Sequence, residues 1–244
     1  MGYKKIFSLV ALALATFATT VKAQDKVEAS VSADIVSKYV WRGQDLGDAA
    51  IQPAASVAYK GLSLSAWGSY GIVNAGEEEF DLTLAYSIGG FNIGVTDYFC
   101  SSTAKYFQYE AHKTAHVFEA NVGYDFGPLS IQWYTNFAGA DGVRRSGSRA
   151  YSSYFELNAP FALGGVDWNA TVGAVPTKTD FYADCENGFA VTNVSLKATK
   201  DIKITDTFSV PVFAAVNANP STQKAYFVFG LTLRPEDTPL LDQH

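Results

Sequence analysis

Nine charged residues recur at alternate positions, within segments whose intervening residues are mostly apolar. They are Asp34, Lys38, Arg42, Lys60, Asp81, Glu119, Glu156, Asp167 and Lys197. Alternate residues of neighbouring strands can line one water-filled channel, and carboxylates that line such a channel favour the passage of cations. With Glu28 and Glu79 near the segment ends, seven acids face four bases, which predicts a modest preference for cations. Pairing between acids and bases would instead fill the channel, and the sequence leaves both alternatives open.

Three histidines, His112, His116 and His244, are the candidates for a catalytic base. His112 and His116 have the spacing of a helical zinc pair and lie near Glu110, but the motif's glutamate after the first histidine is absent. A Ser-His-acid triad is defined by geometry, so sequence order does not exclude one, although no Gly-x-Ser-x-Gly element supports it. We expect no enzyme activity, metal or cofactor, with a lipid or peptide hydrolase as the alternative.

Two cysteines, Cys100 and Cys185, lie in polar segments. We predict a disulfide between them, because an oxidising compartment permits one, and two unpaired thiols are the alternative.

The first residues, 1–23, have the features of a secretory signal peptide. Two lysines precede the apolar run 6–18, and residues 21–23 fit the small-x-small cleavage pattern. The apolar run is too short for a spanning helix. Cleavage after residue 23 would remove three lysines and no acid, changing the formal net charge from −6 to −9. A chain this acidic is a poor candidate for binding nucleic acid.

The segment 27–43 indicates what kind of secondary structure holds the alternating charged residues. From Val27 to Trp41 nearly every second residue is apolar or aromatic, and the residues between them are mostly polar. Side chains alternate across a strand, so this pattern predicts a β-strand with one apolar face and one charged face. Tyr39 and Trp41 end the apolar face, where a membrane strand carries aromatic residues at the boundary of hydrocarbon and water. We interpret 27–43 as the first strand of a transmembrane barrel.

The same alternation continues through about twelve segments, and the connectors between them alternate in length. Long connectors follow the first, third, fifth, seventh and ninth segments, and the tight turns Lys60-Gly61 and Gly89-Gly90 follow the second and fourth. Short periplasmic turns, longer outer loops and an even strand number are typical of outer-membrane barrels. A secreted β-sandwich or soluble barrel also alternates, but a sandwich does not require this order of connectors.

The prediction is therefore an all-β fold, a single transmembrane antiparallel up-and-down β-barrel of about 12 strands. It divides the chain into a signal peptide (1–23), the barrel (24–233) and a polar C-terminal tail (234–244).

Both ends of the predicted barrel resemble the TorF-type porin family of bacterial outer-membrane proteins. The shared features are a Tyr-x-Trp-Arg-Gly end to the first strand, here 39–43, and a Gly-aromatic third strand, here Ala66-Trp67-Gly68. The closing segment 208–233 is similar to the last hairpin of that family. The resemblance implies an outer-membrane location and a role in transport, and it supplies no catalytic residues.

We expect a narrow channel for small solutes or ions, because twelve strands fall between filled eight-stranded barrels and open porins of 16–18 strands. The implied partners are outer-membrane lipid, small solutes or ions and the barrel-assembly machinery, and no nucleic acid. A barrel that binds a partner or sugars through its loops is a further alternative, although interface and loop packing explain the same aromatic residues. The loop candidates are Trp41, Tyr106, Phe107, Tyr109 and Tyr182.

Overall fold

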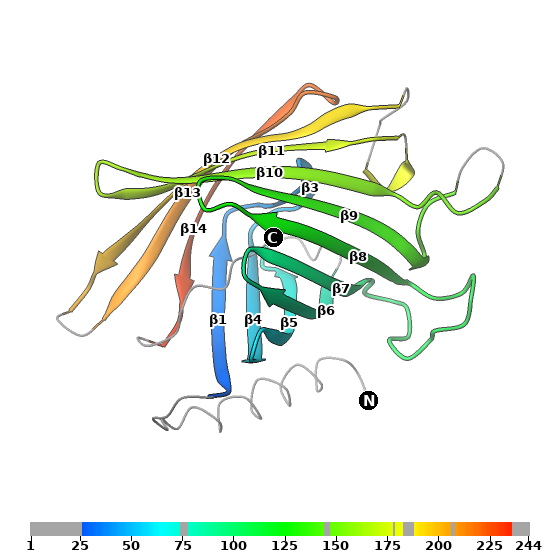
Figure 1. Ribbon diagram of the computed structural model, residues 1–244, viewed down its shortest axis with the longest axis horizontal. Coiled ribbons are helices and arrows are strands. Elements are labelled where there is room, and N and C mark those ends of the chain that lie inside the picture. The colour runs from blue at the N-terminus through cyan, green and yellow to red at the C-terminus, as the bar shows by residue number, and fades with distance from the viewer. Residues whose placement is uncertain are drawn as a thin grey trace.

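The strands of the computed structural model close into a single barrel (Figure 1). The structure describes residues 26–73, 78–143, 147–177, 179–182, 188–205 and 208–235. Within these ranges, twelve antiparallel strands follow one another around the ring in chain order, and β1 pairs with β14 to close it. This arrangement confirms the predicted all-β, up-and-down barrel. No helix among the described residues is long and apolar enough to cross a membrane.

The wall strands are mostly ten or eleven residues long. They are β1 (Glu28–Val36), β4 (Ala50–Tyr59), β5 (Leu62–Gly71), β6 (Glu79–Ile88), β7 (Phe91–Cys100), β8 (His116–Asp125), β9 (Ser130–Gly139), β10 (Ser153–Leu163), β11 (Val166–Val175), β12 (Ala190–Lys203), β13 (Ser209–Asn219) and β14 (Lys224–Leu233).

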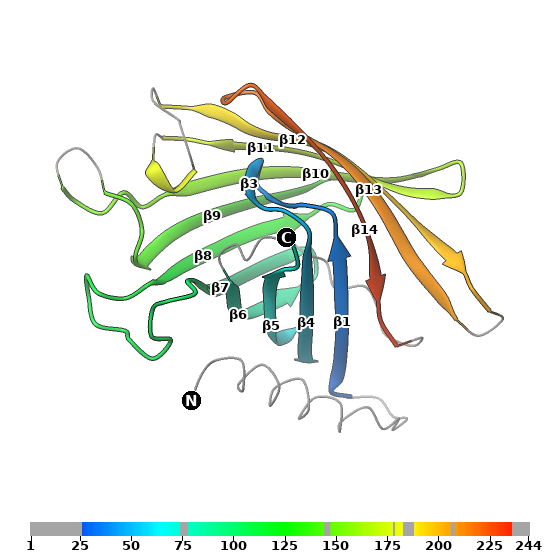
Figure 2. The same ribbon diagram turned by 180° about the vertical axis from the view of Figure 1, so that it is seen from behind.

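The predicted first strand is wrong in its second half. The wall strand β1 ends at Val36, and the chain then forms a separate hairpin of β2 (Tyr39–Trp41) and β3 (Gln44–Gly47), where a polar connector was expected. Figure 2 shows this hairpin leaving the wall between β1 and β4. Tyr39 and Trp41 contact inward-facing residues and do not belong to an outer aromatic belt. Alternation did not reveal this, because a hairpin strand alternates in the same way as a wall strand.

The two faces of the wall differ as predicted. Small polar side chains pair across the strands on the inner face, as Ser30 and Ser56 do with hydroxyl oxygens 2.7 Å apart. Leucine and phenylalanine rows cover the outer face, where Leu84 and Phe229 are 52% and 59% exposed. A soluble barrel or a sandwich would bury its apolar rows inside, so these two alternatives do not fit the structure.

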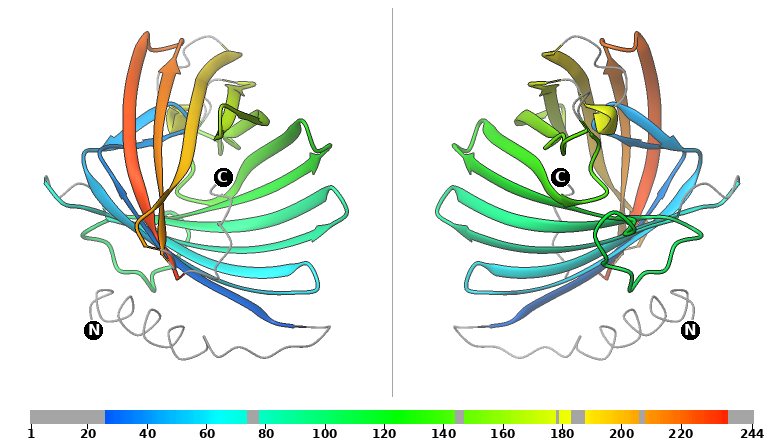
Figure 3. Two further views of the ribbon diagram at one scale, coloured as in Figure 1. Left: turned by 90° about the vertical axis from the view of Figure 1, so that its left-hand side faces the viewer. Right: turned by 90° about the vertical axis from the view of Figure 1, so that its right-hand side faces the viewer.

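The connectors divide the barrel into two ends (Figure 3). At one, called here the short-turn end, Lys60 and Gly61 form a two-residue turn with φ of 49° and 84°, as a type I′ hairpin requires. Outward-facing aromatic side chains gather near this end: Tyr59, Tyr86, Phe91, Tyr124 and Phe126. The opposite, long-connector end carries the β2–β3 hairpin and the described segments 101–115, 140–143, 147–152, 176–177, 179–182 and 188–189. The predicted signal peptide and residues 236–244 of the tail lie outside the described residues.

Candidate functional site

The β2–β3 hairpin enters the lumen at the long-connector end, and its turn consists of Arg42 and Gly43. Their φ values are 48° and 79°, the left-handed region that a type I′ turn needs at both positions. A non-glycine residue held there costs on the order of 1–3 kcal/mol unless its surroundings impose it. A Cβ atom at Gly43 would collide with the carbonyl oxygen of Thr192, and Asn219 Nδ2 donates to the Gly43 carbonyl at 3.1 Å. The turn is therefore seated against β12 and β13.

Arg42 reaches the opposite wall and forms a two-point ion pair with Glu119 of β8. Its Nη1 and Nη2 donate to Glu119 Oε2 and Oε1 at 2.6 Å and 2.9 Å. The two side chains are only 5% and 1% exposed. The sequence predicted that both residues line the lumen, and the structure pairs them across it.

Four tyrosines complete the surroundings of this ion pair, and we call Glu119 with Tyr98, Tyr134, Tyr154 and Tyr182 the Glu119–tyrosine cage. The Arg42 guanidinium carbon lies 3.9 Å from the ring centroid of Tyr134 and 4.7 Å from that of Tyr154. These two tyrosines stand on β9 and β10, across the ring from the hairpin. Stacking of this kind contributes roughly 0.5–2 kcal/mol per ring, with the higher values in desolvated sites.

The other two tyrosines hold the Glu119 carboxylate. The Tyr98 hydroxyl donates to Oε1 at 2.8 Å, and the Tyr182 hydroxyl donates to Oε2 at 3.2 Å. Tyr182 belongs to the short 3-10 helix η1 (Asp180–Tyr182), and Trp41 of the hairpin stacks on it with centroids 5.9 Å apart. Burial raises the pKa of Tyr182 well above its usual range, so its hydroxyl stays protonated and remains a donor. The carboxylate thus has protein donors in addition to Arg42.

Further acids surround the cage. Asp81 is buried and pairs in register with Tyr98, while Glu79 accepts a hydrogen bond from Tyr39 at 2.8 Å. Glu156 accepts one from Tyr154 at 2.6 Å. Four acidic side chains, including Glu119, therefore lie in the part of the lumen that Arg42 reaches.

The opposite side of the hairpin rests on apolar side chains. Val36, Ala50, Ala215 and Val228 form a buried cluster, against which Val40 of the hairpin and Phe213 pack. The hairpin therefore touches both sides of the lumen at the long-connector end. The inner faces toward the short-turn end carry small polar side chains such as Ser30 and Asn121.

The remaining predicted lumen residues do not converge on the cage. Lys38 bonds Asp45 of the same hairpin at 2.8 Å. Lys60 and Asp167 lie exposed near the short-turn end. Asp34 is buried in β1, and the Lys197 ammonium lies 4.4 Å from the ring centroid of Phe213. The nine residues thus lie at several heights along the barrel axis and do not form one ring.

The histidines do not form the metal group that their spacing suggested. His116 is fully buried on the outer face, with Nδ1 2.7 Å from Asp97 Oδ1 and Nε2 2.5 Å from the Tyr106 carbonyl oxygen. Glu110 bonds Lys113 instead, at 2.7 Å. In the ranges that the structure covers, no three His, Cys, Asp or Glu side chains are grouped to hold a metal.

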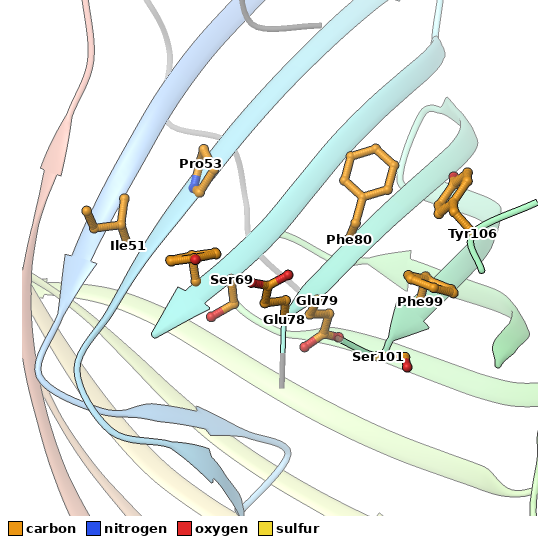
Figure 4. A pocket seen from close by; sticks show the side chains of 10 residues that line it. Ile51, Pro53, Ser69, Glu78, Glu79, Phe80, Phe99, Ser101 and Tyr106 are labelled. Atoms are coloured by element: carbon orange, nitrogen blue, oxygen red, sulfur yellow. The ribbon is translucent and has the colours of Figure 1, made fainter. Parts of the chain in front are cut away.

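An apolar hollow of about 300 Å³ lies on the outer face at the long-connector end. Phe80, Phe99 and Tyr106 stand on one side of it and Ile51 and Pro53 on the other (Figure 4). Sequence analysis did not predict it, because segment 101–115 folds back over the wall to form one side. Since it opens outside the barrel, the hollow is not part of the lumen.

The loop aromatics have mixed roles. Trp41 and Tyr182 lie in the lumen. Tyr109 stacks on His116 with centroids 4.3 Å apart, and Tyr106 meets the same ring edge-on at 5.1 Å. Phe107 is 75% exposed and is available for a partner.

Sequence reasoning missed Tyr98, Tyr134 and Tyr154 as site residues. A signal was present, because Tyr134 and Tyr154 fall among the polar alternate residues of two neighbouring strands, near the same end. An aromatic residue on a water-facing side has no apolar neighbours to explain it. The predicted disulfide remains a prediction, because Cys185 lies outside the described residues while Cys100 ends β7.

Comparison with known proteins gives remote likenesses. No family model matches the chain, and no curated protein matches its sequence, so the resemblance to the TorF-type family is not confirmed. Solved structures similar to it include a Salmonella typhi OmpF complex with daunomycin, at 10% identity over 86% of this chain and 98% of that one, with a TM-score of 0.37. An anion-selective porin from Comamonas acidovorans is 12% identical over 85% of this chain and 83% of that one, with a TM-score of 0.31. At such distances, the function of this chain has to be inferred from its own residues.

Proposed function

We propose that this protein is an outer-membrane β-barrel that forms a narrow channel for small solutes or ions. The observation that carries the proposal is that the closed barrel has an apolar outer face and a polar inner face. Exposed rows of leucine and phenylalanine suit contact with lipid, and the enclosed polar and charged side chains suit water. Strands of about ten residues also match the thickness of a bilayer when tilted.

The outer membrane is the proposed location because residues 1–23 read as an export signal and the wall is a barrel. The outward aromatic side chains near the short-turn end suit one membrane–water interface. Lipid, small solutes and the barrel-assembly machinery are the partners that this location implies.

The β2–β3 hairpin makes the proposed channel narrow. Its turn crosses the lumen between the apolar cluster and the cage, so a solute has to pass beside it or displace it. The acids Glu79, Asp81 and Glu156 around the cage favour cations over anions.

No catalytic activity is proposed. His116 has an acidic partner in Asp97, but it is enclosed beneath the segment 101–115 and a substrate cannot reach it.

Two measurements on the refolded protein test this proposal together. Folded barrel should migrate faster than boiled protein in detergent gels, and reconstituted protein should give small, cation-selective conductance steps in planar bilayers. A folded barrel without conductance, for the native chain and for a chain lacking the hairpin, would contradict the channel. Solubility at high concentration without detergent would contradict the membrane location.

A further inference from the structure

We propose that the Glu119–tyrosine cage is a binding site for solutes that carry a guanidinium group, and that Arg42 occupies it as a built-in competitor. Binding of a guanidinium group to the cage does not depend on whether the barrel conducts. Only the suggestion that such solutes pass through the lumen rests on the function proposed above.

The shape of the cage selects a guanidinium group. A carboxylate that accepts two parallel N–H bonds matches the planar guanidinium, as the contacts at 2.6 Å and 2.9 Å to Glu119 show. The rings of Tyr134 and Tyr154 offer their π-faces to the delocalised charge. An ammonium group is compact and cannot make the two-point contact, so it should bind more weakly.

The geometry of the cage depends only in part on Arg42, whose Nη1 also donates to the Tyr182 hydroxyl at 2.5 Å. Tyr98 and Tyr182 hold the Glu119 carboxylate through their own hydroxyls. Tyr154 is held in turn by bonds to Glu156 and Asn193.

Without Arg42, the buried Glu119 carboxylate would lack the partner of its negative charge. Glu119 is 1% exposed, and Asp81 beside Tyr98 has one buried carboxylate oxygen with no hydrogen-bond partner among the described residues. Two buried acids with no base between them take up either a proton or a cation from solution, so an added guanidinium competes with the proton for Glu119.

Arg42 is also placed so that a solute can displace it. The β2–β3 sheet is separate from the wall, and its strands span only three and four residues. Arg42 has a φ of 48°, a conformation that costs a non-glycine residue free energy and that release of the hairpin would relieve. The barrel can stay closed meanwhile, because Val36 pairs directly with Ala50 beneath the hairpin.

The test replaces the arginine side chain with a free ligand. Arg42→Gly suits the left-handed backbone and removes only the side chain. The melting temperature of the purified full-length variant in detergent should rise by several degrees with low millimolar ethylguanidinium, and ethylammonium at equal ionic strength should have a much smaller effect. Lys38→Ala, which removes the other cation of the hairpin from its exposed pair with Asp45, is the matched control and should show no such rise.

Equal shifts in both variants, or none in Arg42→Gly, would overturn the proposal. The double variant Arg42→Gly/Glu119→Gln removes the buried carboxylate and should lose the response to ethylguanidinium. If Arg42→Gly fails to fold, its refolding yield with and without ethylguanidinium becomes the measurement, and no recovery would equally overturn the site.

Conductance separates this proposal from the channel itself. Stabilisation of Arg42→Gly without current in any variant would leave the site standing and reject the channel. Current through Arg42→Gly that ethylguanidinium neither blocks nor alters, with no stabilisation, would reject the site and leave the channel standing.

Discussion

Arg42 and Glu119 lie 77 residues apart in the sequence, yet they form a two-point ion pair across the lumen that is almost fully excluded from solvent. Burying two charges costs desolvation free energy that the pairing only partly offsets, so such a pair is weak evidence for stability. The pair does determine where the two side chains lie, because either charge buried there without the other would be far less stable. The pair therefore holds the hairpin turn at one place in the lumen.

Removal of the acid should release the hairpin. Glu119→Gln leaves a buried guanidinium without its carboxylate, which should destabilise the native arrangement by about 3–5 kcal/mol. We expect a lower melting temperature in detergent and a larger conductance in bilayers. Lys38→Ala breaks an exposed pair of the same hairpin and should change stability by at most about 1 kcal/mol. Unchanged conductance in Glu119→Gln would show that the pair does not restrict the lumen.

A single methyl group at Gly43 should have a related effect for a different reason. In Gly43→Ala the new Cβ would meet the Thr192 carbonyl oxygen, so the turn has to move away from β12. Gly164→Ala is the matched control, because Gly164 also has a positive φ, 66°, but nothing lies near its Cβ position. Both variants should lose about 1–2 kcal/mol through backbone strain. Only Gly43→Ala should also increase conductance. Equal currents in the two variants would show that contact of the turn with β12 does not restrict the lumen.

The whole hairpin should be removable without loss of the barrel. Val36 and Ala50 are cross-strand partners, so an Asn-Gly type I′ turn can replace residues 37–49 and join β1 directly to β4. The shortened chain should keep its heat-modifiable migration and give a higher conductance than the native chain. Loss of the folded band would mean that the wall needs the hairpin, although β2 and β3 form a sheet of their own.

The sequence predicted the wall well, because each strand separates two environments and its alternate residues record that difference. Leu84 and Thr83 lie next to each other on β6 but face opposite sides, and their types alone indicate which side is which. The turn Lys60-Gly61 was predicted for a similar local reason, since a two-residue hairpin needs positive φ.

The site could not be predicted in the same way. Tyr39 and Trp41 continue the alternation of β1, and only the contacts of the folded chain show that they turn inward. The cage assembles side chains from separate strands and from η1, so no spacing in the sequence marks it. Segment 101–115 likewise covers Phe99 and His116 on a face that the pattern assigns to lipid.

The membrane location can be tested on one outward residue. Leu84 lies near the middle of β6, 52% exposed, between Leu64 and Val95 on the neighbouring strands. If this face meets lipid, Leu84→Arg should destabilise the barrel folded in lipid vesicles by about 2–4 kcal/mol, as an arginine at the bilayer midplane does.

If the same face met water, the substitution would replace an exposed apolar side chain with a charged one and change stability by at most about 0.5 kcal/mol. Phe107→Arg, on an exposed loop position, controls for the added charge and should be close to neutral in either case. Urea unfolding from vesicles measures both variants, and a neutral Leu84→Arg would mean that the apolar rows do not contact hydrocarbon.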